Sequence, residues 1–282
     1  MSETVGLRRR IGLLVLFLLG GLLVFVADDF LKNGIRLIFE IGITVAFLLL
    51  ALWLRTNEQR RKYFQVTFVF FIASLVMLLV GLLPYPGSSA NPTATAYLLY
   101  QIISTLIIII PIILLTKLSG ADFSSIFLQK GKLRLGLIIG LIPFLFFVLL
   151  ILAFPAGLKY ASNLFSISED LTYERILSLM PLVVVFVLLN GFKEELSTRA
   201  IFLKRFEPFI GARLSNVSTG FVFAASHVGV NYTPALLVFL GITFILALAW
   251  GYVMQKTNSI IGPALFHGAM DITIVLGIFS FL

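Results

Sequence analysis

Unbroken apolar runs recur along the whole chain, among them LLVLFLLGGLLVFVA near the start and LIIIIPIILL in the middle. Hydrophobic residues make up 60% of the 282 positions and charged residues 12%, and the mean hydropathy is +1.08. Such runs are typical of helices that cross the hydrocarbon core of a bilayer. They lack the apolar and polar alternation of transmembrane β-strands. We therefore expect an all-α fold, a polytopic transmembrane helical bundle.

At about 20 residues per span, the chain has room for eight or nine spans joined by short connections. The candidate spans cover residues 11–27, 36–54, 64–84, 96–116, 134–156, 176–206, 214–231, 234–255 and 259–281. The first span follows a basic segment, as in a signal peptide, but Phe25 stands where cleavage after Ala27 would need a small residue. The sequence therefore predicts an uncleaved first span.

The basic residues predict the orientation of the bundle. With nine spans and the N-terminus in the cytoplasm, 17 of the 21 Lys and Arg residues fall in cytoplasmic segments. This excess is the usual topology signal, so the net charge of +8 indicates membrane orientation and not binding of nucleic acid. Because the chain is compact and carries no organelle signal, we expect a multi-pass protein of a prokaryotic plasma membrane.

A polar segment at 157–175 divides the chain into two parts with different chemistry. The apolar runs before it contain no histidine, and their only embedded acid is Glu40. Both histidines of the chain and most of its embedded charge come after it. We predict an N-terminal transmembrane scaffold of about five spans in residues 1–156 and a catalytic membrane domain in residues 157–282.

Ionisable residues inside a transmembrane helix are costly, so each is a functional hypothesis by default. If the sixth predicted helix continues to its basic end, Glu194 lies about 16 Å from that end at 1.5 Å per residue. By the same rise, His227 and His267 lie about 21 Å and 16 Å from the basic ends of their own helices. The three side chains are therefore predicted to meet at a similar depth.

The two adjacent acids are predicted to differ in their surroundings. Glu195 and Arg199 are four residues apart, so they can pair on one helix face and neutralise each other. Glu194 is turned about 100° away and shares its face with Asn190 and Thr198. Glu194 is thus the less compensated acid and the better candidate for a general base that takes a proton from water.

Each histidine lies four residues from a second candidate side chain, the same spacing as between Glu195 and Arg199. Phe223 precedes His227 by four residues, and Asp271 follows His267 by four. A histidine near the glutamate can hold the attacking water or stabilise a developing oxyanion. We therefore expect these residues to complete a hydrolytic site with Glu194.

Each of these signals also has a purely structural interpretation. Glu194, Glu195 and Arg199 could mark the cytoplasmic end of a shorter span, followed by an amphipathic surface helix STRAIFLKRFEPF. His227 could lie at the outer interface, where HVGVNYTP turns, and His267 could be a hydrogen-bonding residue of helix packing. The signals taken together favour a functional site.

Three short motifs resemble those of one protein family. EELSTR at 194–199, FAASH at 223–227 and HGAMD at 267–271 are similar to the EExxxR, FxxxH and HxxxN motifs of CPBP intramembrane proteases. That family includes the type II CAAX prenyl endopeptidases and the Abi, or bacteriocin-immunity, proteins. The resemblance covers about residues 175–282, and the three motifs occur in the family's order on successive apolar segments.

The resemblance implies a role for each matching residue. Glu194 and His227 would activate the attacking water, His267 and residue 271 would stabilise the oxyanion, and Glu195 with Arg199 would support the geometry of the site. The chain departs from the family at Asp271, where asparagine is usual, because a carboxylate donates no hydrogen bond unless it is protonated. Asp271 is then protonated, or it orients His267, or the activity is weakened.

The resemblance leaves the metal question open, because such proteases have been described both as metalloenzymes and as metal-independent glutamate proteases. Two histidines with Glu194 or Asp271 could bind zinc, with Glu194, His227 and His267 as the favoured ligand set. The absence of HExxH spacing, with a glutamate placed as base, favours a metal-free mechanism without a cofactor. The chain has no cysteine, which excludes thiolate ligands and a cysteine nucleophile.

We expect an intramembrane endopeptidase that hydrolyses a peptide bond of a membrane-associated substrate, prenylated if it is of CaaX type, near the cytoplasmic leaflet. Its partners would be that peptide or protein substrate and the lipid bilayer. A non-catalytic bacteriocin-immunity or membrane interaction protein of the same fold is the alternative. An ion-coupled transporter is disfavoured, because the first half offers no inverted repeat of the acidic cluster.

Overall fold

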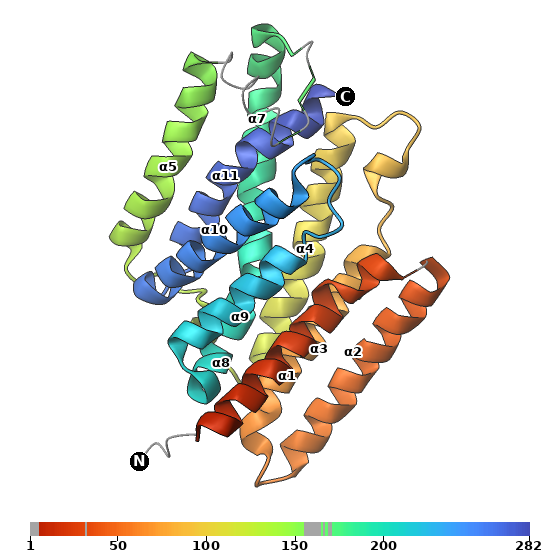
Figure 1. The fold of residues 1–282 in the computed structure, drawn as a ribbon, viewed down its shortest axis with the longest axis vertical. Coiled ribbons are helices and arrows are strands. Elements are labelled where there is room, and N and C mark those ends of the chain that lie inside the picture. Colours follow the sequence, from red (N-terminus) through yellow and green to blue (C-terminus); the bar gives the residue numbers. More distant parts are fainter. Residues whose placement is uncertain (1–5, 32, 155–164, 166, 169–170) are drawn as a thin grey trace.

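The computed structural model describes residues 6–31, 33–154, 165, 167–168 and 171–282. All regular elements in these ranges are helical, which confirms the predicted all-α fold (Figure 1). Most of the polar segment 157–175 lies outside the described residues, as do Lys32 and Lys159, two of the four basic residues predicted to be extracytoplasmic.

The long helices follow one another with short connections. They are α1 (Leu7–Phe25), α2 (Asn33–Thr56), α3 (Phe64–Gly81), α4 (Ala94–Leu118), α5 (Leu133–Ala153), α7 (Tyr173–Glu194), α8 (Ile201–Ile210), α9 (Ala212–Ala225), α10 (Leu236–Thr257) and α11 (Ile261–Ser280). A π-helical turn, Glu195–Ala200, joins α7 to α8 without a break. The sixth predicted span therefore does continue past Arg205, as the depth argument required.

Seven helices of the described residues are long and apolar enough to cross a membrane. They are Gly34–Thr56, Arg61–Ser88, Ala94–Leu118, Leu133–Ala153, Tyr173–Ile210, Leu236–Thr257 and Ile261–Ser280. The protein is thus a multi-pass helical membrane protein with fewer clear spans than the eight or nine predicted. Helix α1 begins with three arginines, and α9 has 14 residues, which is about 21 Å and too short for a 30 Å core.

The basic connections meet at one end of the bundle. The backbone N–H of Lys132 donates to the carbonyl of Thr257 at 2.7 Å, and the Lys204 ammonium donates to the carbonyl of Ser124 at 2.6 Å. Arg9 donates to the hydroxyl of Tyr63 at the same end. Segments that the charge pattern assigned to one side of the membrane therefore contact each other.

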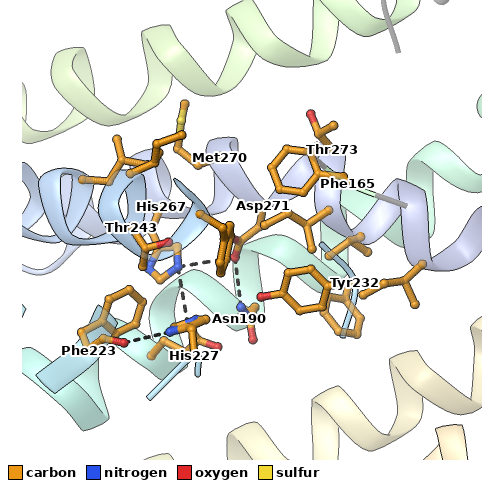
Figure 2. A pocket seen from close by; sticks show the side chains of 18 of the residues that line it. Phe165, Asn190, Phe223, His227, Tyr232, Thr243, His267, Met270, Asp271 and Thr273 are labelled. Atoms are coloured by element: carbon orange, nitrogen blue, oxygen red, sulfur yellow. Dashed lines mark hydrogen bonds and ion pairs between the residues drawn. The ribbon is translucent and has the colours of Figure 1, made fainter. Parts of the chain in front are cut away.

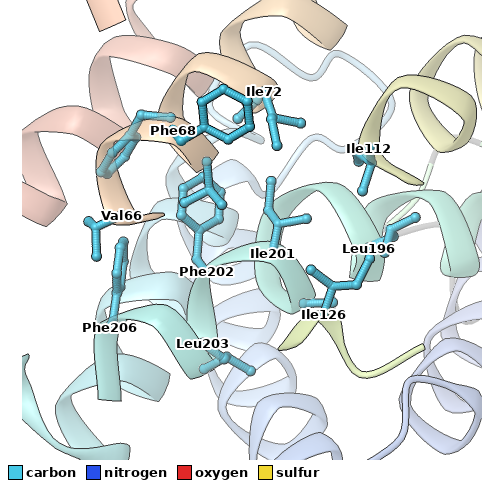
Figure 3. Close-up of a cluster of buried hydrophobic side chains, with 14 of the residues drawn as sticks. Val66, Phe68, Ile72, Ile112, Ile126, Leu196, Ile201, Phe202, Leu203 and Phe206 are labelled. Atoms are coloured by element: carbon cyan, nitrogen blue, oxygen red, sulfur yellow. The ribbon is translucent and has the colours of Figure 1, made fainter. Parts of the chain in front are cut away.

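Helix α8 is buried in the bundle and is not a surface helix. Its side chains Ile201, Phe202, Leu203 and Phe206 are at most 3% exposed and pack among residues of α3 and α4 (Figure 3). The ring of Phe206 also stacks on Phe17 of α1, with centroids 4.1 Å apart. The amphipathic surface-helix interpretation of STRAIFLKRFEPF is therefore wrong, and the acidic motif lies inside the protein.

Two glycines let α7 and α11 approach each other at the depth of the site. A Cβ atom at Gly191 would lie 2.5 Å from the carbonyl oxygen of Ala264, and one at Gly268 would lie 2.8 Å from that of Val187. Small residues at a helix crossing allow such backbone contact in membranes. The contact places Glu194 and Glu195 of one helix beside His267 of the other.

Candidate active site

The acidic motif lies where α7 widens into the π-helical turn. All six residues of the turn are buried, and Arg199 and Glu195 are 0% exposed. Single π-helical turns inside α-helices occur frequently at functional sites. Glu194, the last residue of α7, has a side chain that is 26% exposed. The two adjacent acids are therefore in different environments, as their spacing predicted.

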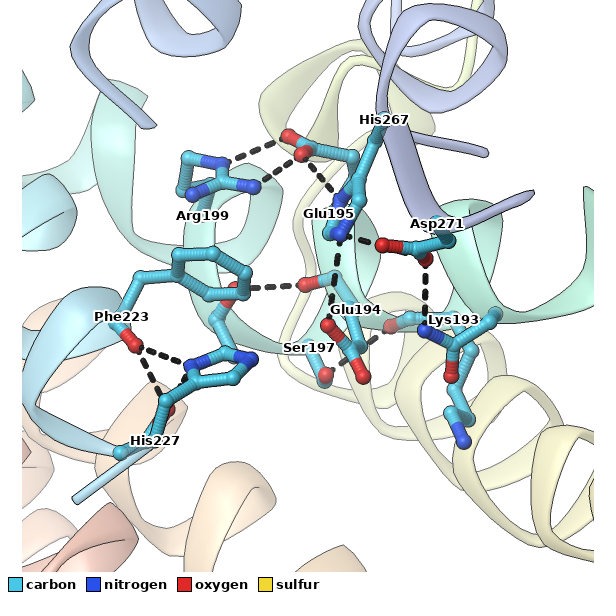
Figure 4. A network of polar contacts seen from close by, with 12 residues as sticks. Lys193, Glu194, Glu195, Ser197, Arg199, Phe223, His227, His267 and Asp271 are labelled. Atoms are coloured by element: carbon cyan, nitrogen blue, oxygen red, sulfur yellow. Dashed lines mark hydrogen bonds and ion pairs between the residues drawn. The ribbon is translucent and has the colours of Figure 1, made fainter. Parts of the chain in front are cut away.

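The carboxylate of Glu195 is bound by the side chains of Arg199 and His267 (Figure 4). Arg199 donates to both carboxylate oxygens, from Nε at 2.6 Å and from Nη2, which confirms the predicted pair. The Nδ1 atom of His267 lies 2.9 Å from Oε1 of the same carboxylate. Neutralisation by a well-made ion pair and the added hydrogen bond offset the cost of burying Glu195. Its lone pairs are engaged, so Glu195 is unavailable as a base.

Aromatic rings surround Arg199 and His267. The guanidinium lies 4.1 Å from the ring centroid of Phe223 and 5.2 Å from that of Trp250, at cation–π distance. Trp250 also stacks on the His267 ring, with centroids 4.2 Å apart and planes 9° from parallel. Phe223 meets the same imidazole edge-on at 5.4 Å. These contacts fix the ring plane of His267.

The second nitrogen of His267 faces two further carboxylates. Its Nε2 atom lies 3.5 Å from Oε2 of Glu194 and 3.6 Å from Oδ2 of Asp271. Ionised carboxylates are acceptors only, and they face both ring nitrogens. His267 is therefore suited to donate a hydrogen bond from each nitrogen.

The two ring nitrogens of His227 differ in their partners, because Nδ1 lies beside a backbone carbonyl and Nε2 does not. It lies in the turn just after α9, which ends at Ala225, and not on a helix that continues to residue 231 as predicted. Its Nδ1 atom is 2.8 Å from the carbonyl oxygen of Phe223, an acceptor, so this nitrogen carries the proton. Nε2 is then left as an acceptor, the form that can take a hydrogen bond from water.

Asp271 is the acceptor at one end of a series of polar contacts. The Nδ2 atom of Asn190 donates to its Oδ2 at 3.0 Å. Oδ1 of Asn190 accepts from Nε2 of Gln101 at 3.2 Å, and Oε1 of Gln101 accepts from the Lys193 ammonium at 2.9 Å. Gln101 belongs to α4, so the half that we predicted to be scaffold contributes to this network.

Two cavities meet at Glu194 and His227. One, of about 490 Å³, contains His267, Asp271 and Asn190 and is otherwise lined mainly by apolar side chains from α7, α10 and α11 (Figure 2). The other, of about 610 Å³, extends toward Asp28, Asp29 and Arg36 at the other end of the bundle from the basic connections. Both cavities share Tyr85, Glu194, Phe223, His227 and Tyr232. Burial raises the pKa of the Tyr232 phenol, so its hydroxyl keeps its proton.

The structure brings all six predicted site residues together, but in two groups. Glu194, His227, His267 and Asp271 line a cavity, whereas Glu195 and Arg199 lie behind His267 and line neither cavity described here. His227 and Glu194 share both cavities without a direct hydrogen bond in the described residues.

Sequence reasoning missed Trp250, Lys193 and Gln101. Trp250 is one of two tryptophans of the chain and lies in the apolar helix α10. The rarity of tryptophan is the one sequence feature that could have drawn attention to it. Lys193 directly precedes Glu194, but the partner that it binds lies 92 residues earlier. The contacts of these residues depend on how the helices cross.

A metal ion would need three or more suitable ligands around one point. In the part of the chain that the structure describes, no group of three His, Cys, Asp or Glu side chains is placed to hold one. The residues present therefore do not match the suggested zinc ligand set, and we derive no step through a metal.

The fold and the site define a class: a multi-pass helical membrane protein with a buried glutamate and two histidines at a shared cavity. Residues 176–273 match the family model described as type II CAAX prenyl endopeptidase Rce1-like. This segment, which contains all six predicted site residues, is a domain of that CPBP protease family. A search of curated proteins and a search of solved structures each found no match.

Proposed function

We propose that the protein is an intramembrane endopeptidase whose Glu194 and His227 activate a water molecule. The observation that carries this proposal is the contrast between two adjacent acids. Glu195 is fully buried and bound by Arg199 and His267, whereas the Glu194 carboxylate is open to the cavity that also contains the acceptor nitrogen of His227. A general base must reach the proton that it abstracts, directly or through one water.

The reaction proceeds by addition of water to the peptide carbonyl. Glu194 takes one proton of a water held by Nε2 of His227, and the water oxygen bonds to the carbonyl carbon while the C=O π electrons move to the carbonyl oxygen. When the C=O bond forms again, the C–N bond breaks and the proton on Glu194 passes to the leaving nitrogen. The products are an amine and a carboxylic acid that ionises, and Glu194 is again a carboxylate.

His267 is assigned to the oxyanion. Its Nε2–H points into the cavity beside Glu194, and donors aimed at developing charge are the largest single contribution in many hydrolases. Glu195 and Arg199 act as positioning residues outside the cavity lining, because Glu195 binds Nδ1 of His267 and Arg199 holds the Glu195 carboxylate.

The apolar lining of the cavity and the family model support the proposed substrate class. Phe147, Phe186, Phe239 and Met270 help to enclose the first cavity, which suits an apolar segment or a lipid-modified residue beside the scissile bond. The family model is that of CAAX prenyl endopeptidases, so a prenylated CaaX-type peptide is the first substrate to try.

The proposed setting is a plasma membrane with the N-terminus and the basic end of the bundle in the cytoplasm. Helix α1, whose three arginines lie in its first turn, would then be an eighth span beside the seven clear ones. Residues 1–156 would serve as scaffold and residues 157–282 as catalytic domain, with Gln101 as a contribution of the scaffold to the site.

The test uses purified protein in liposomes with a panel of fluorogenic peptides, prenylated and unprenylated. Wild type is expected to cleave at least one, and Glu194→Gln and His227→Gln are expected to lose about 10²- to 10⁴-fold in kcat. Full activity of both variants would refute the proposal. If no peptide is cleaved and both variants still protect cells against a bacteriocin, the protein is the non-catalytic immunity protein, an alternative that the carboxylate at Asp271 favours.

A further inference from the structure

Lys193 carries an ammonium group inside the membrane that has no ion pair among the described residues. It belongs to the span Tyr173–Ile210 and precedes Lys204, at the basic end of the bundle, by about 16 Å at 1.5 Å per residue, which is farther than a lysine side chain extends. Its one hydrogen-bond acceptor in the described part of the chain is the neutral Oε1 of Gln101, at 2.9 Å. Carboxylates of the active site attract it only from a greater distance. A charge in this setting is a functional hypothesis by default.

The ammonium of Lys193 has donors to spare in the second cavity. Arg36, the other Lys or Arg side chain of this lining, is bound by Asp28 at 2.7 Å and by Glu40 at 2.9 Å. Lys193 has three N–H donors, and its amide partner accepts one of them. Two donors therefore remain for an anionic group that enters the cavity beside Glu194.

The two cavities differ in chemistry on either side of the proposed water-activating pair. Glu194 and His227 line both cavities, so a peptide bond held between them has one flank in each. No Lys or Arg is among the described residues that line the first cavity, and most of its lining is apolar. An apolar or lipid-modified flank fits the first cavity, and the opposite flank then lies beside Lys193.

A carboxylate is the anion that an unmodified peptide can offer to Lys193. Side-chain carboxylates are costly and rare in apolar segments within a membrane, whereas every peptide chain ends in a carboxylate. The Cα atoms of Lys193 and Glu194 are about 3.8 Å apart, and an extended peptide advances about 3.3 Å per residue. A terminal carboxylate at the ammonium therefore leaves room for only a few residues after the scissile bond. Asp28 and Asp29, at the far end of the cavity, would repel a carboxylate that extended further.

We propose that Lys193 binds the C-terminal carboxylate of the substrate and makes the protein selective for peptide bonds close to a free C-terminus. The carboxylate accepts charge-assisted hydrogen bonds from the ammonium. Gln101 is a positioning residue, because it holds the Lys193 side chain toward α4 and away from the pair of Glu195 and Arg199 (Figure 4). This assignment rests on the proposed endopeptidase function and names the end of the peptide that the second cavity takes.

The experiment compares kcat/KM in liposomes for two matched peptides, which end about three residues after the scissile bond in a free carboxylate or in the neutral amide. Wild type should prefer the free carboxylate about 10- to 100-fold, as expected of hydrogen bonds between charged groups. Lys193→Gln should lose this preference, and Lys193→Arg, which keeps the charge, should retain most of it. Arg36→Gln is the matched control, because it removes the other cation of the cavity and should keep the full preference.

Two further peptides test which carboxylate Lys193 binds. One ends in an amidated glutamate and carries its carboxylate on the side chain, and the other has a free carboxylate about ten residues after the scissile bond, beyond the reach of the ammonium. Wild type should cleave both as slowly as the short amidated peptide. A preference for the amidated glutamate peptide over the short free carboxylate would assign Lys193 to a side-chain carboxylate and overturn the proposal.

The remaining outcomes separate this assignment from the proposed function. Equal cleavage of the two short peptides by wild type, with Glu194→Gln inactive, would overturn the role of Lys193 and leave the endopeptidase intact. A Lys193→Gln variant with an unchanged melting temperature that slows both peptides equally and keeps the preference would assign Lys193 to the electrostatics of Glu194, which also overturns it. No cleavage by wild type, or equal activity of wild type and Glu194→Gln, would overturn the endopeptidase and the assignment together.

Discussion

At the residue scale, the site depends on the difference between two neighbouring glutamates. Glu195 has its carboxylate satisfied by Arg199 and His267, so its charge is structural. Glu194 keeps its carboxylate at the cavity, where its Oε2 atom lies 3.5 Å from Nε2 of His267. Equivalent substitutions at the two positions should therefore have different effects.

Glu194→Gln should reduce activity and leave stability nearly unchanged, because it removes a base that is partly exposed to the cavity. Glu195→Gln should lower the free energy of unfolding by about 3 kcal/mol, because it leaves the guanidinium of Arg199 buried with a neutral partner. Thermal unfolding in detergent and peptide cleavage measure the two effects. A stability loss at Glu194 with none at Glu195 would contradict this division of roles.

The two histidines should differ in which of their ring nitrogens carry a proton. His267 faces carboxylate oxygens with both nitrogens, and His227 binds a carbonyl through Nδ1 alone. ¹⁵N-histidine spectra at neutral pH should show His267 protonated on both nitrogens and His227 on Nδ1 only. The chain has only two histidines, so His227→Gln assigns the signals. A signal of His227 with the proton on Nε2 would refute its role as water acceptor.

The sequence was sufficient to predict the residues related by helical spacing. Glu195 with Arg199 and His267 with Asp271 are each four residues apart on one helix, and both pairs come together in the structure. Trp250 and Gln101 could not be predicted, because their contacts with His267 and Asn190 depend on helix crossings between distant segments. Residue spacing predicts which side chains share one face of a helix. It does not predict which other helix packs against that face.

At the element scale, α7 and α11 form the crossing on which the site is built. Gly191 of α7 and Gly268 of α11 allow the two backbones to come into contact. Glu194 lies three residues after Gly191, and His267 directly precedes Gly268. The sequence predicted both helices, but not the π-helical turn after Glu194, because one widened turn of six residues is too short to be recognised in an apolar segment.

Gly191→Ala should lower the unfolding free energy by about 1 to 3 kcal/mol, the usual cost of overpacking, because its new methyl group would meet the carbonyl oxygen of Ala264. Activity should fall as His267 moves away from Glu194. Gly241→Ala in α10 is the matched control, since nothing lies within 4 Å of its added Cβ. Identical melting temperatures for the two variants would contradict the close crossing.

At the scale of the whole molecule, an apolar bundle carries its basic connections at one end. Large side chains such as Leu49, Leu106 and Leu149 are more than half exposed, as expected of a surface that faces the hydrocarbon core of a bilayer. Seven helices of the described residues are clear spans, whereas α9, to which the sequence assigned a span, has only 14 residues. The second cavity extends away from the basic end, toward Asp28 and Asp29.

Cysteine labelling tests the orientation of the bundle, because the chain has no cysteine of its own. Lys130→Cys, in a basic connection, should be protected in intact cells from a membrane-impermeant thiol reagent, and Ser89→Cys, in the connection between α3 and α4, should react. Both positions are exposed in the structure, so access depends on the side of the membrane. The reverse labelling pattern would contradict a cytoplasmic N-terminus.

In the proposed mechanism, Glu194 activates water and does not attack the substrate itself. The most direct test of this mechanism is a single turnover with excess enzyme in H₂¹⁸O, followed by mass spectrometry of the cleaved peptide. We expect one ¹⁸O atom in the new carboxylate of the first product, and no cleavage by Glu194→Gln. A first product without ¹⁸O, with the label in Glu194, would contradict it.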